Sequence, residues 1–378
     1  MVLVDEATGK KRWEVQGHAG ANSRRHVAMS PNGRFVASVG YDEENWKLWD
    51  AANGAEWMTG ARHDGTGGCS CTVNTKQEGC PVVAHTTGLR ALAFSPCGQL
   101  LATGGYHGAV ILWNIQTGGG ERRMQGPGTR NLPVWSLSFS ANGVWLASGS
   151  GDQTIRVWDV TTGALLRSIR DVGSFWVAFS PSNSRMLASI SSFSTGQMAL
   201  WDVALGHKIW KREGHGFFAV FYPDGRTIAT GALNSDVLLV NAESGEPRLT
   251  LGAPPSRWWE QPRRISAASF SVDHGSKLAT ASADGTCKVW DSSTGALLHK
   301  FNSGNCVMSV MWGRDWVRDT QGAMAFAMGH HPRLGVGSPV LELEAGVVRM
   351  ILDCVLWPGA SSTWTADLAW EGGGGSHQ

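Results

Sequence analysis

The sequence lacks an excess of either charge and lacks a long apolar run. Its 378 residues contain 32 Lys and Arg against 31 Asp and Glu, whereas a general nucleic-acid binder usually carries a strong positive excess. The segment from Val347 to Trp357 is interrupted by Arg349 and Asp353 and is too short to span a bilayer. The N-terminus has no basic stretch followed by an apolar run, so no signal peptide is predicted. We therefore expect a soluble protein of the cytoplasm or the nucleus, for which nucleic acid and membranes are disfavoured as partners.

Cysteine is too scarce and too scattered for a disulfide scaffold. The seven Cys are an odd number, and only Cys69, Cys71 and Cys80 lie close together. Small secreted domains use densely paired cysteines, and structural zinc sites usually present Cys-x₂-Cys pairs. Because the Cys-x-Cys spacing here fits neither class, we predict no metal site. Residues 61–84 are expected to form a Gly-rich loop, inserted in the second of the repeat units described below, whose deletion leaves the fold intact.

Glycine and tryptophan, in contrast, are abundant. The chain has 49 Gly and 19 Trp. Glycine supplies turns that need a positive φ, and large aromatic side chains favour strands. Both observations indicate an all-β protein with many tight turns.

A six-residue pattern recurs along the chain: an apolar or Trp residue, an acid or amide, three variable residues and Gly. The usual spacing of roughly 40–50 residues is the period of a four-stranded propeller blade. The longer gap of 64 residues between Trp49 and Trp113 indicates the insert. Full copies begin at Val4, Trp49, Trp113, Trp158, Trp201, Val240 and Trp290, and a degenerate copy begins at Leu341.

Each unit repeats the same order of segments. An alternating apolar segment ends in a Ser-Pro-like turn, as in HVAMSPNG and ALAFSPCG. A second segment follows, such as RFVASVG or QLLATGG, and a third ends in the Trp-Asp pair, as in IRVWD. Asn-Gly and Cys-Gly steps between the first two segments favour hairpin turns. The order predicts antiparallel sheets repeated around an axis.

These motifs resemble WD40 repeats. Gly-His, Ser-Pro-Asn-Gly, Leu-Ala-Ser-Gly and Trp-Asp stand at the offsets of that family over about residues 2–346. One copy would be a weak signal, but six or seven copies in register are specific. The resemblance implies an all-β propeller of four-stranded antiparallel blades.

The number of full units favours seven blades. The units end near residues 50, 114, 159, 202, 241, 291 and 344. We assign residues 1–346 to the propeller, with Val2 to Asp5 as an extra outer strand, and residues 347–378 to a degenerate or partly disordered tail. The alternative is eight blades, in which the tail and the N-terminal strand form a broken last blade. Because open sheet edges promote aggregation, either ring is expected to close.

The resemblance also implies a buried polar network in each blade, which joins a Gly-His histidine, a Ser or Thr, a turn Asp and the Trp indole. Such a network stabilises only when every member is satisfied. The third unit has no matching His, and the fifth has Asn234 and Val240 at the acid and Trp positions. The residues expected to have this structural role are His18, Ser38, Asp42, Trp49, Asp152, Trp158, Trp201, His215, Asp284 and Trp290.

The sequence has no recognisable catalytic motif. It contains no G-x-S-x-G elbow, no P-loop and no dinucleotide fingerprint between a strand and a helix. His18 and His215 fall where the family has buried structural histidines. We therefore predict no enzyme activity and no cofactor. Two alternatives remain open: a hydrolase-like propeller with a site in the central channel, and the sensor portion of a larger signalling protein.

The predicted partner site lies where each innermost strand begins, a region that faces the top surface in WD-repeat proteins. Arg, Trp and Phe dominate interface energetics, and guanidinium groups suit acidic or phosphorylated oxygens. Removing one such Arg should leave folding nearly unchanged, because exposed charges contribute little to stability. Counting back from the aromatic or Met residue near the end of the first segment of each unit selects the candidate partner residues. They are Arg25, Arg90, Trp135, Phe175, Phe217, Arg264 and Met308.

We therefore predict a non-enzymatic platform that binds a protein or peptide on the top face. An acidic or phosphorylated segment is the specialised case. The adjacent pair Trp258 and Trp259, in a loop with Pro254, Pro255 and Arg257, is a second candidate contact, since exposed aromatic side chains in a loop suggest binding.

Overall fold

The computed structural model describes most of the central part of the chain and short segments near both ends. Every element in the described part is a β-strand, and none of its residues forms a helix long and apolar enough to cross a membrane. The described residues are 2–5, 11–15, 18, 25–40, 46–60, 88–126, 132–170, 176–191, 196–213, 215–232, 237–252, 265–271, 274–282, 284–302, 306–314, 322–326, 349–355 and 365–366.

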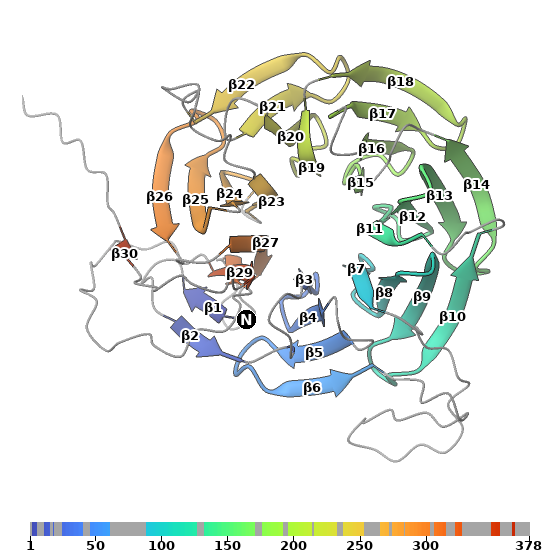
Figure 1. Ribbon diagram of the computed structural model, residues 1–378, viewed down its shortest axis with the longest axis horizontal. Helices are drawn as coiled ribbons and strands as arrows, with labels where there is room; N and C mark the ends of the chain where they lie inside the picture. The colour runs from blue at the N-terminus through green and yellow to red at the C-terminus, as the bar shows by residue number, and fades with distance from the viewer. Residues whose placement is uncertain are drawn as a thin grey trace, which may run out of the picture.

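Six antiparallel sheets stand around an axis as the blades of a propeller (Figure 1). In each blade the chain runs outward, so the first strand is innermost and the fourth is outermost (Figure 1). Blade 1 consists of β3 (Arg25–Met29), β4 (Phe35–Gly40), β5 (Trp46–Asp50) and β6 (Glu56–Thr59). Blade 2 consists of β7 (Leu89–Phe94), β8 (Leu100–Gly105), β9 (Ala109–Asn114) and β10 (Gly120–Gln125). Blade 3 consists of β11 (Val134–Phe139), β12 (Trp145–Ser150), β13 (Thr154–Asp159) and β14 (Leu165–Arg170). Blade 4 consists of β15 (Trp176–Phe179), β16 (Met186–Ile190), β17 (Met198–Asp202) and β18 (His207–Arg212). Blade 5 consists of β19 (His215–Phe221), β20 (Thr227–Ala232), β21 (Val237–Asn241) and β22 (Pro247–Leu251). Blade 6 consists of β23 (Ile265–Phe270), β24 (Lys277–Ser282), β25 (Thr286–Asp291) and β26 (Leu297–Asn302), and β30 (Thr365–Ala366) pairs with the edge of β26.

The turn between the third and fourth strands shows why the six-residue pattern recurs. In blade 3 the carboxylate of Asp159 accepts a hydrogen bond from the Thr162 backbone N–H at 2.7 Å, and its carbonyl accepts one from the Gly163 N–H at 2.8 Å. Gly163 has a φ of 74°, which glycine adopts at no steric cost. The outer strand then pairs with a register shift, which recurs at the same place in all six blades. The acid and the glycine therefore fix where each outermost strand begins.

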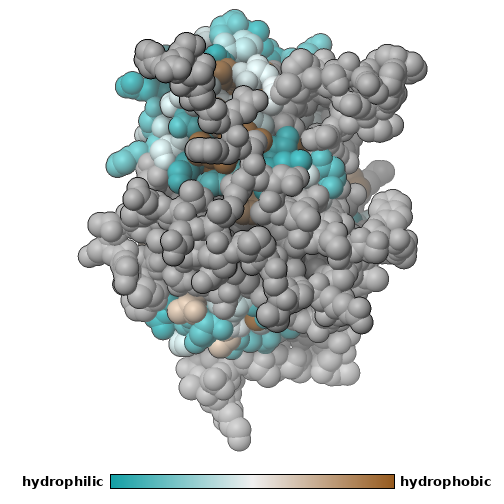
Figure 2. All heavy atoms as spheres, turned by 90° about the vertical axis from the view of Figure 1, so that its left-hand side faces the viewer, coloured by the Kyte–Doolittle hydropathy of each residue, from teal (hydrophilic) through white to brown (hydrophobic). Residues whose placement is uncertain are grey.

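The apolar core lies between neighbouring blades. The rings of Trp46 in blade 1 and Trp113 in blade 2 have centroids 5.4 Å apart, and Trp158 of blade 3 belongs to the same buried cluster as Leu112 of blade 2. Trp113 and Trp158 thus fill the spaces between neighbouring sheets. The described surface on the side of β26 is mostly hydrophilic, with small hydrophobic areas (Figure 2).

Outer strands also hold the next blade along the chain. Trp210 of β18 donates its Nε1–H to the Ala242 carbonyl in blade 5 at 2.8 Å, and its ring lies against the glycine of that turn. Trp13 of β2 (Lys11–Glu14) does the same in blade 1, with its Nε1–H 3.0 Å from the Ala51 carbonyl. Trp210 therefore joins β18 to blade 5, and Trp13 joins β2 to blade 1, each by ring packing and by a hydrogen bond.

A further sheet, which we call the β27 sheet, lies between blade 6 and blade 1 (Figure 1). In it β27 pairs with β28 and β29, and β1 pairs with β28 and β29. The Met29 N–H, 3.0 Å from the Met311 Sδ, links blade 1 to this sheet. Its strands are β1 (Val2–Asp5), β27 (Cys306–Arg314), β28 (Gly322–Phe326) and β29 (Arg349–Val355).

The described part of the chain shows six four-stranded blades, one fewer than the seven expected. The seventh unit was expected to end at Leu341 to Gly346, and those residues lie outside the described part. β1 does not form an extra outer strand, because its residues pair with both β28 and β29. The two ends of the chain meet in this sheet, so its pairing does not follow the simple order of the other blades. The boundary at residue 346 stays a prediction, as does the inserted loop at 61–84, which lies outside the described residues.

Candidate functional site on the top face of blades 2 and 3

The strand register defines one face of the ring, which we call the top face. Leu89 at the start of β7 pairs with Gly105 at the end of β8. In the same way, Val134 at the start of β11 pairs with Ser150 at the end of β12. The starts of the innermost strands and the loops between second and third strands therefore lie together on this face. We call the opposite face the bottom face.

Arg90 and Trp135, two of the predicted partner residues, meet on the top face. The guanidinium carbon of Arg90 lies 4.2 Å from the centroid of the Trp135 ring and 5.3 Å from that of the Tyr106 ring. A cation over an aromatic face is attracted by the ring quadrupole. Arg90 is only 8 % exposed, whereas Tyr106 is 40 % exposed. The rings therefore hold the guanidinium below a surface that the aromatic side chains present.

Leu132 extends this surface from the loop before β11. It is 40 % exposed, and Leu132 and Trp135 both lie close to Gly151. A Cβ on Gly151 would stand 3.1 Å from the Trp135 Nε1 and 3.8 Å from the Leu132 Cβ. We call Arg90, Tyr106, Leu132 and Trp135 the top-face cluster.

The burial of Arg90 corrects one expectation. The sequence suggested an exposed charge whose removal leaves folding nearly unchanged, but this side chain is packed under two rings. Truncating a buried Arg removes the packing of its stem as well as its charge. An Arg90→Ala variant is therefore expected to lose stability and is not a clean test of binding.

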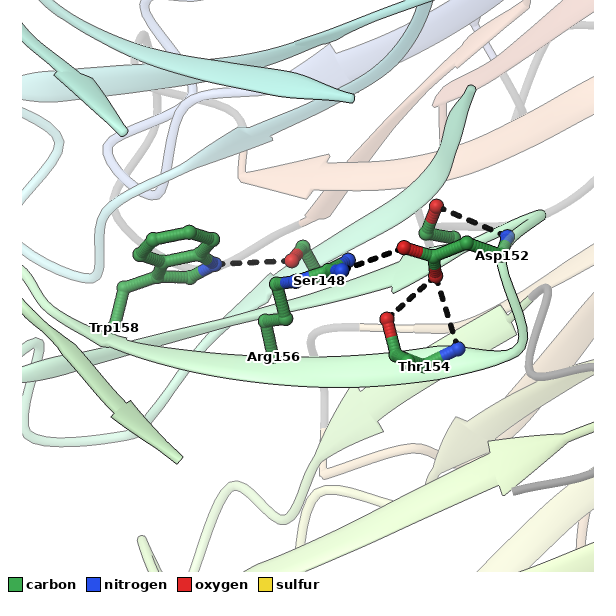
Figure 3. A network of polar contacts seen from close by, with 6 residues as sticks. Ser148, Asp152, Thr154, Arg156 and Trp158 are labelled. Carbon is green, nitrogen blue, oxygen red and sulfur yellow. Dashed lines mark hydrogen bonds and ion pairs between the residues drawn. The ribbon is translucent and has the colours of Figure 1, made fainter. Parts of the chain in front are cut away.

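Blade 3 contains a polar network at the same face (Figure 3). The Asp152 Oδ2 lies 2.5 Å from the Arg156 Nη2, with side chains 14 % and 7 % exposed. The Asp152 Oδ1 accepts hydrogen bonds from the Thr154 backbone N–H at 3.0 Å and from its hydroxyl at 2.5 Å. Burial raises the pKa of Asp152, but the hydrogen bonds from Arg156 and Thr154 outweigh it and lower the pKa below its ordinary value. Next along β13, the Trp158 Nε1–H donates to the Ser148 Oγ at 2.9 Å.

Arg156 supplies the cation that the sequence analysis did not assign. The third unit has no matching His, and Arg156 from β13 pairs with the turn acid instead. A Cβ on Gly126 would lie 2.3 Å from the Arg156 Nε, so the side chain packs directly on the backbone at the end of β10. The sequence did contain a signal for this cation, namely its position in the repeat. The residue two positions before the third-strand Trp is Lys47 in blade 1, Arg156 in blade 3 and Lys288 in blade 6.

In blade 1, His18 and Trp49 meet at Ser38. The His18 Nε2 lies 2.9 Å from the Ser38 Oγ, and the Trp49 Nε1–H donates to the same oxygen at 2.8 Å. His18 is 3 % exposed, so this pairing is part of the interior. Asp42, the expected fourth member, lies outside the described residues.

The other blades repeat the indole bond. The Trp201 Nε1–H donates to the Ser189 Oγ at 2.9 Å, and the Trp290 Nε1–H donates to the Thr280 Oγ1 at 3.0 Å. In blade 6 the Asp284 carboxylate accepts hydrogen bonds from the hydroxyl and the backbone N–H of Thr286. For His215 the structure describes only the backbone, at the start of β19.

The remaining predicted partner residues are not brought together by the described part of the chain. Phe175 and Arg264 lie outside it, as do Trp258 and Trp259. For Arg25, Phe217 and Met308 only the backbone is described. The convergence of three arginines on the ring axis therefore stays a prediction.

Repeated four-stranded blades, five of which have a third-strand Trp whose indole donates to a Ser or Thr, define the protein as a β-propeller. Four segments match the family described as WD domain, G-beta repeat: residues 9–50, 78–114, 122–159 and 260–291. The chain therefore contains segments that match WD40 repeats. Propellers of this family typically mediate protein–protein interactions and are typically not enzymes. Within the described residues, no three His, Cys, Asp or Glu side chains gather as a metal site would require.

Similar proteins match over a short part of their length. WD repeat-containing protein 1 of Gallus gallus is 31 % identical over 99 residues, which are 26 % of this chain and 15 % of the relative. The protein of the same name from Bos taurus is 29 % identical, over 26 % of this chain and 16 % of its own length. Periodic tryptophan protein 2 of Arabidopsis thaliana is 33 % identical, over 25 % and 10 % respectively. The matches thus cover between a tenth and a sixth of the length of these relatives.

Proposed function

We propose that this chain is a non-enzymatic platform that binds a protein or peptide partner at the top-face cluster. The observation that carries the proposal is the Arg90 guanidinium held against Trp135 and Tyr106, with Tyr106 and Leu132 each 40 % exposed. Tyr, Trp and Arg are the side chains that most often dominate binding energy. Because packing already fixes Arg90 and Trp135, these two side chains lose little conformational entropy when a partner binds there.

The partner that fits this surface has an apolar side chain beside an acidic or phosphorylated group. The apolar side chain packs between Tyr106 and Leu132, and the anion faces Arg90, whose charge favours such oxygens. Since Arg90 is 8 % exposed, the apolar contact comes first and the ionic contact is secondary. We place the protein in the cytoplasm or the nucleus, where such a partner would be met.

The test compares proteins retained by the immobilised chain and by a Tyr106→Ser/Leu132→Ser variant, with quantification by mass spectrometry. A specific partner should be retained at least about tenfold less by the variant, which corresponds to about 1.4 kcal/mol of binding free energy. The matched control is Val144→Ser, because Val144 is also an exposed apolar residue of blade 3, at 43 %, but lies in the β11–β12 loop on the bottom face. An unchanged set of retained proteins, or an equal loss with Val144→Ser, contradicts the proposal.

We also propose that the β27 sheet is the seventh blade of the ring, with β2 as its outermost strand. Trp13 of β2 contacts blade 1 with the same donor, acceptor and glycine contact that Trp210 of β18 makes with blade 5. An outer strand of a blade preceding blade 1 would make this contact. Trp13→Ala should therefore lower the urea midpoint as much as Trp210→Ala does. A Trp13→Ala variant as stable as the parent would argue against a seventh blade.

A further inference from the structure

The outermost strand of every blade has one residue left out of the pairing. The register shift next to the third-strand Trp, or next to Val240 in blade 5, skips a residue, and such a bulge turns its side chain out of the ladder. In blades 3 and 4 the skipped residues are Leu166 and Ile209, which are 48 % and 44 % exposed. The skipped residues of the six blades in order are Trp57, Glu121, Leu166, Ile209, Arg248 and Leu298.

A contact between blades 3 and 4 brings β14 close to the turn that precedes β18. β14 and β18 are outermost strands of neighbouring blades (Figure 1). The Arg167 Nη2 of β14 donates to the Ala204 carbonyl at 2.7 Å, in the turn that leads into β18. The next residue of that turn, Leu205, is 56 % exposed. We call Leu166, Leu205 and Ile209 the rim patch.

The two strands that contribute to the rim patch are rich in cations. β14 and β18 contain five Lys and Arg and no Asp or Glu, although the whole chain has a net charge of only +1. Lys211 and Arg212 have the acidic partners Glu213 and Glu246. No other outermost strand of the six blades combines an exposed apolar bulge with more than one Lys or Arg. Basic and apolar character therefore coincide in blades 3 and 4.

We infer that the rim patch is a second interaction surface, which binds an acidic protein segment with apolar side chains. Leu166, Leu205 and Ile209 offer apolar contact, and the neighbouring cations attract carboxylates through the local field that they create together. Exposed apolar groups rimmed by charge mark binding surfaces more often than scattered single residues do. This surface is on the outer wall, apart from the top-face cluster, so it is independent of the function proposed above.

The same residues favour a protein segment over a nucleic acid or a membrane. Phosphates gain nothing from half-exposed Leu and Ile, and bases stack on accessible aromatic faces. The aromatic ring of β18, Trp210, is already placed against blade 5. Insertion into lipid needs apolar side chains that project beyond their surroundings, whereas Leu166 and Ile209 are each still about half covered.

The experiment measures the fluorescence anisotropy of a short fluorescein-labelled peptide in which pairs of Asp alternate with pairs of Leu. A peptide with Ser in place of Leu is the control probe. Leu166→Ser/Ile209→Ser and Arg170→Gln/Lys211→Gln should each weaken binding about tenfold. Leu298→Ser is the matched control, since Leu298 is the skipped residue of blade 6 and is 39 % exposed. Urea midpoints show that each variant is folded.

Binding of the Asp and Leu peptide, weakened by both double substitutions and by added salt but not by Leu298→Ser, supports the inference. Four results overturn it: no binding of this peptide, equal binding of the Ser peptide, equal binding by the double variants, and an equal loss with Leu298→Ser. Preferential binding of poly-uridine RNA, or of vesicles containing phosphatidylserine, through the same side chains also overturns it, because the partner would then belong to another class.

Discussion

Replacing Arg156 with Ala should destabilise the ring by about 2–4 kcal/mol. At 2.5 Å between the Arg156 Nη2 and the Asp152 Oδ2, an effective dielectric constant of about 20 gives an attraction of roughly 6–7 kcal/mol. Most of this attraction is offset by the cost of removing both charges from water, and breaking a buried pair on one side costs about 3–5 kcal/mol. The expected loss of stability is smaller here, because Asp152 keeps both hydrogen bonds from Thr154 after Arg156 is removed.

The assay is urea unfolding of the single variants Arg156→Ala and Asp152→Asn and of the double variant. Because the two groups interact directly, the double variant should lose less than the sum of the single losses, with a coupling of about 0.5–3 kcal/mol. Arg167→Ala is the matched control. Its guanidinium is exposed and donates to a carbonyl, so it should cost less than about 1 kcal/mol. Additive losses, or a loss below about 0.5 kcal/mol for Arg156→Ala, would refute the argument.

The same pair predicts an acid dependence. The pKa of Asp152 is lowered in the folded chain from an ordinary value of 3.8. Stability from this carboxylate is therefore fully present above that value and is lost as the pH falls through the lower folded pKa. Asp152→Asn should remove this part of the acid loss, which urea midpoints across the acid range measure. An unchanged acid profile would show that other carboxylates account for it.

Three further predictions test the interior and its pH response by urea unfolding. Trp158→Phe removes the donor to Ser148 and should cost about 1–2 kcal/mol, whereas Trp158→Ala should cost about 3–5 kcal/mol; unchanged midpoints would show that the indole is not structural. Gly126→Ala should cost about 1–3 kcal/mol because the added Cβ meets the Arg156 Nε, whereas Gly119→Ala, with its nearest contact at 3.4 Å, should be tolerated; equal effects would contradict the packing argument. Burial and then the charge of Lys277 lower the pKa of His299 from 6.5, so stability should decline as the pH falls below that value, and His299→Gln should lessen the decline. An identical pH profile for that variant would exclude His299 as its source.

The sequence predicted the blades because every blade uses the same local chemistry. The Trp-Asp pair and the glycine that follows build one turn, as Asp159 and Gly163 do, and alternation gives the strands on either side. The indole donors of Trp158, Trp201 and Trp290 each find a Ser or Thr. These features depend on short segments of the chain, so a repeated pattern is enough to predict them.

What the sequence could not predict depends on contacts between segments. Tyr106 joins Arg90 only because the loop after β8 and the start of β7 share a face, which requires the register of both strands. Arg156 replaces the expected His by reaching Asp152 across a turn. The β27 sheet combines both ends of the chain, and no local pattern encodes such a pairing.

The order of contacts around the ring has a consequence for folding kinetics. Side-chain bonds between neighbouring blades join residues 32 to 43 positions apart, so the array can grow by short-range steps, as in a linear repeat protein. The bond from Met29 to Met311 instead spans 282 positions. Contacts of long sequence separation are slow to form, because the entropy of the intervening loop must be lost before the contact can stabilise the chain. Joining β27 to blade 1 should therefore be the late, rate-limiting event, and a chain stopped before β27 would keep its blades stacked in an open arc.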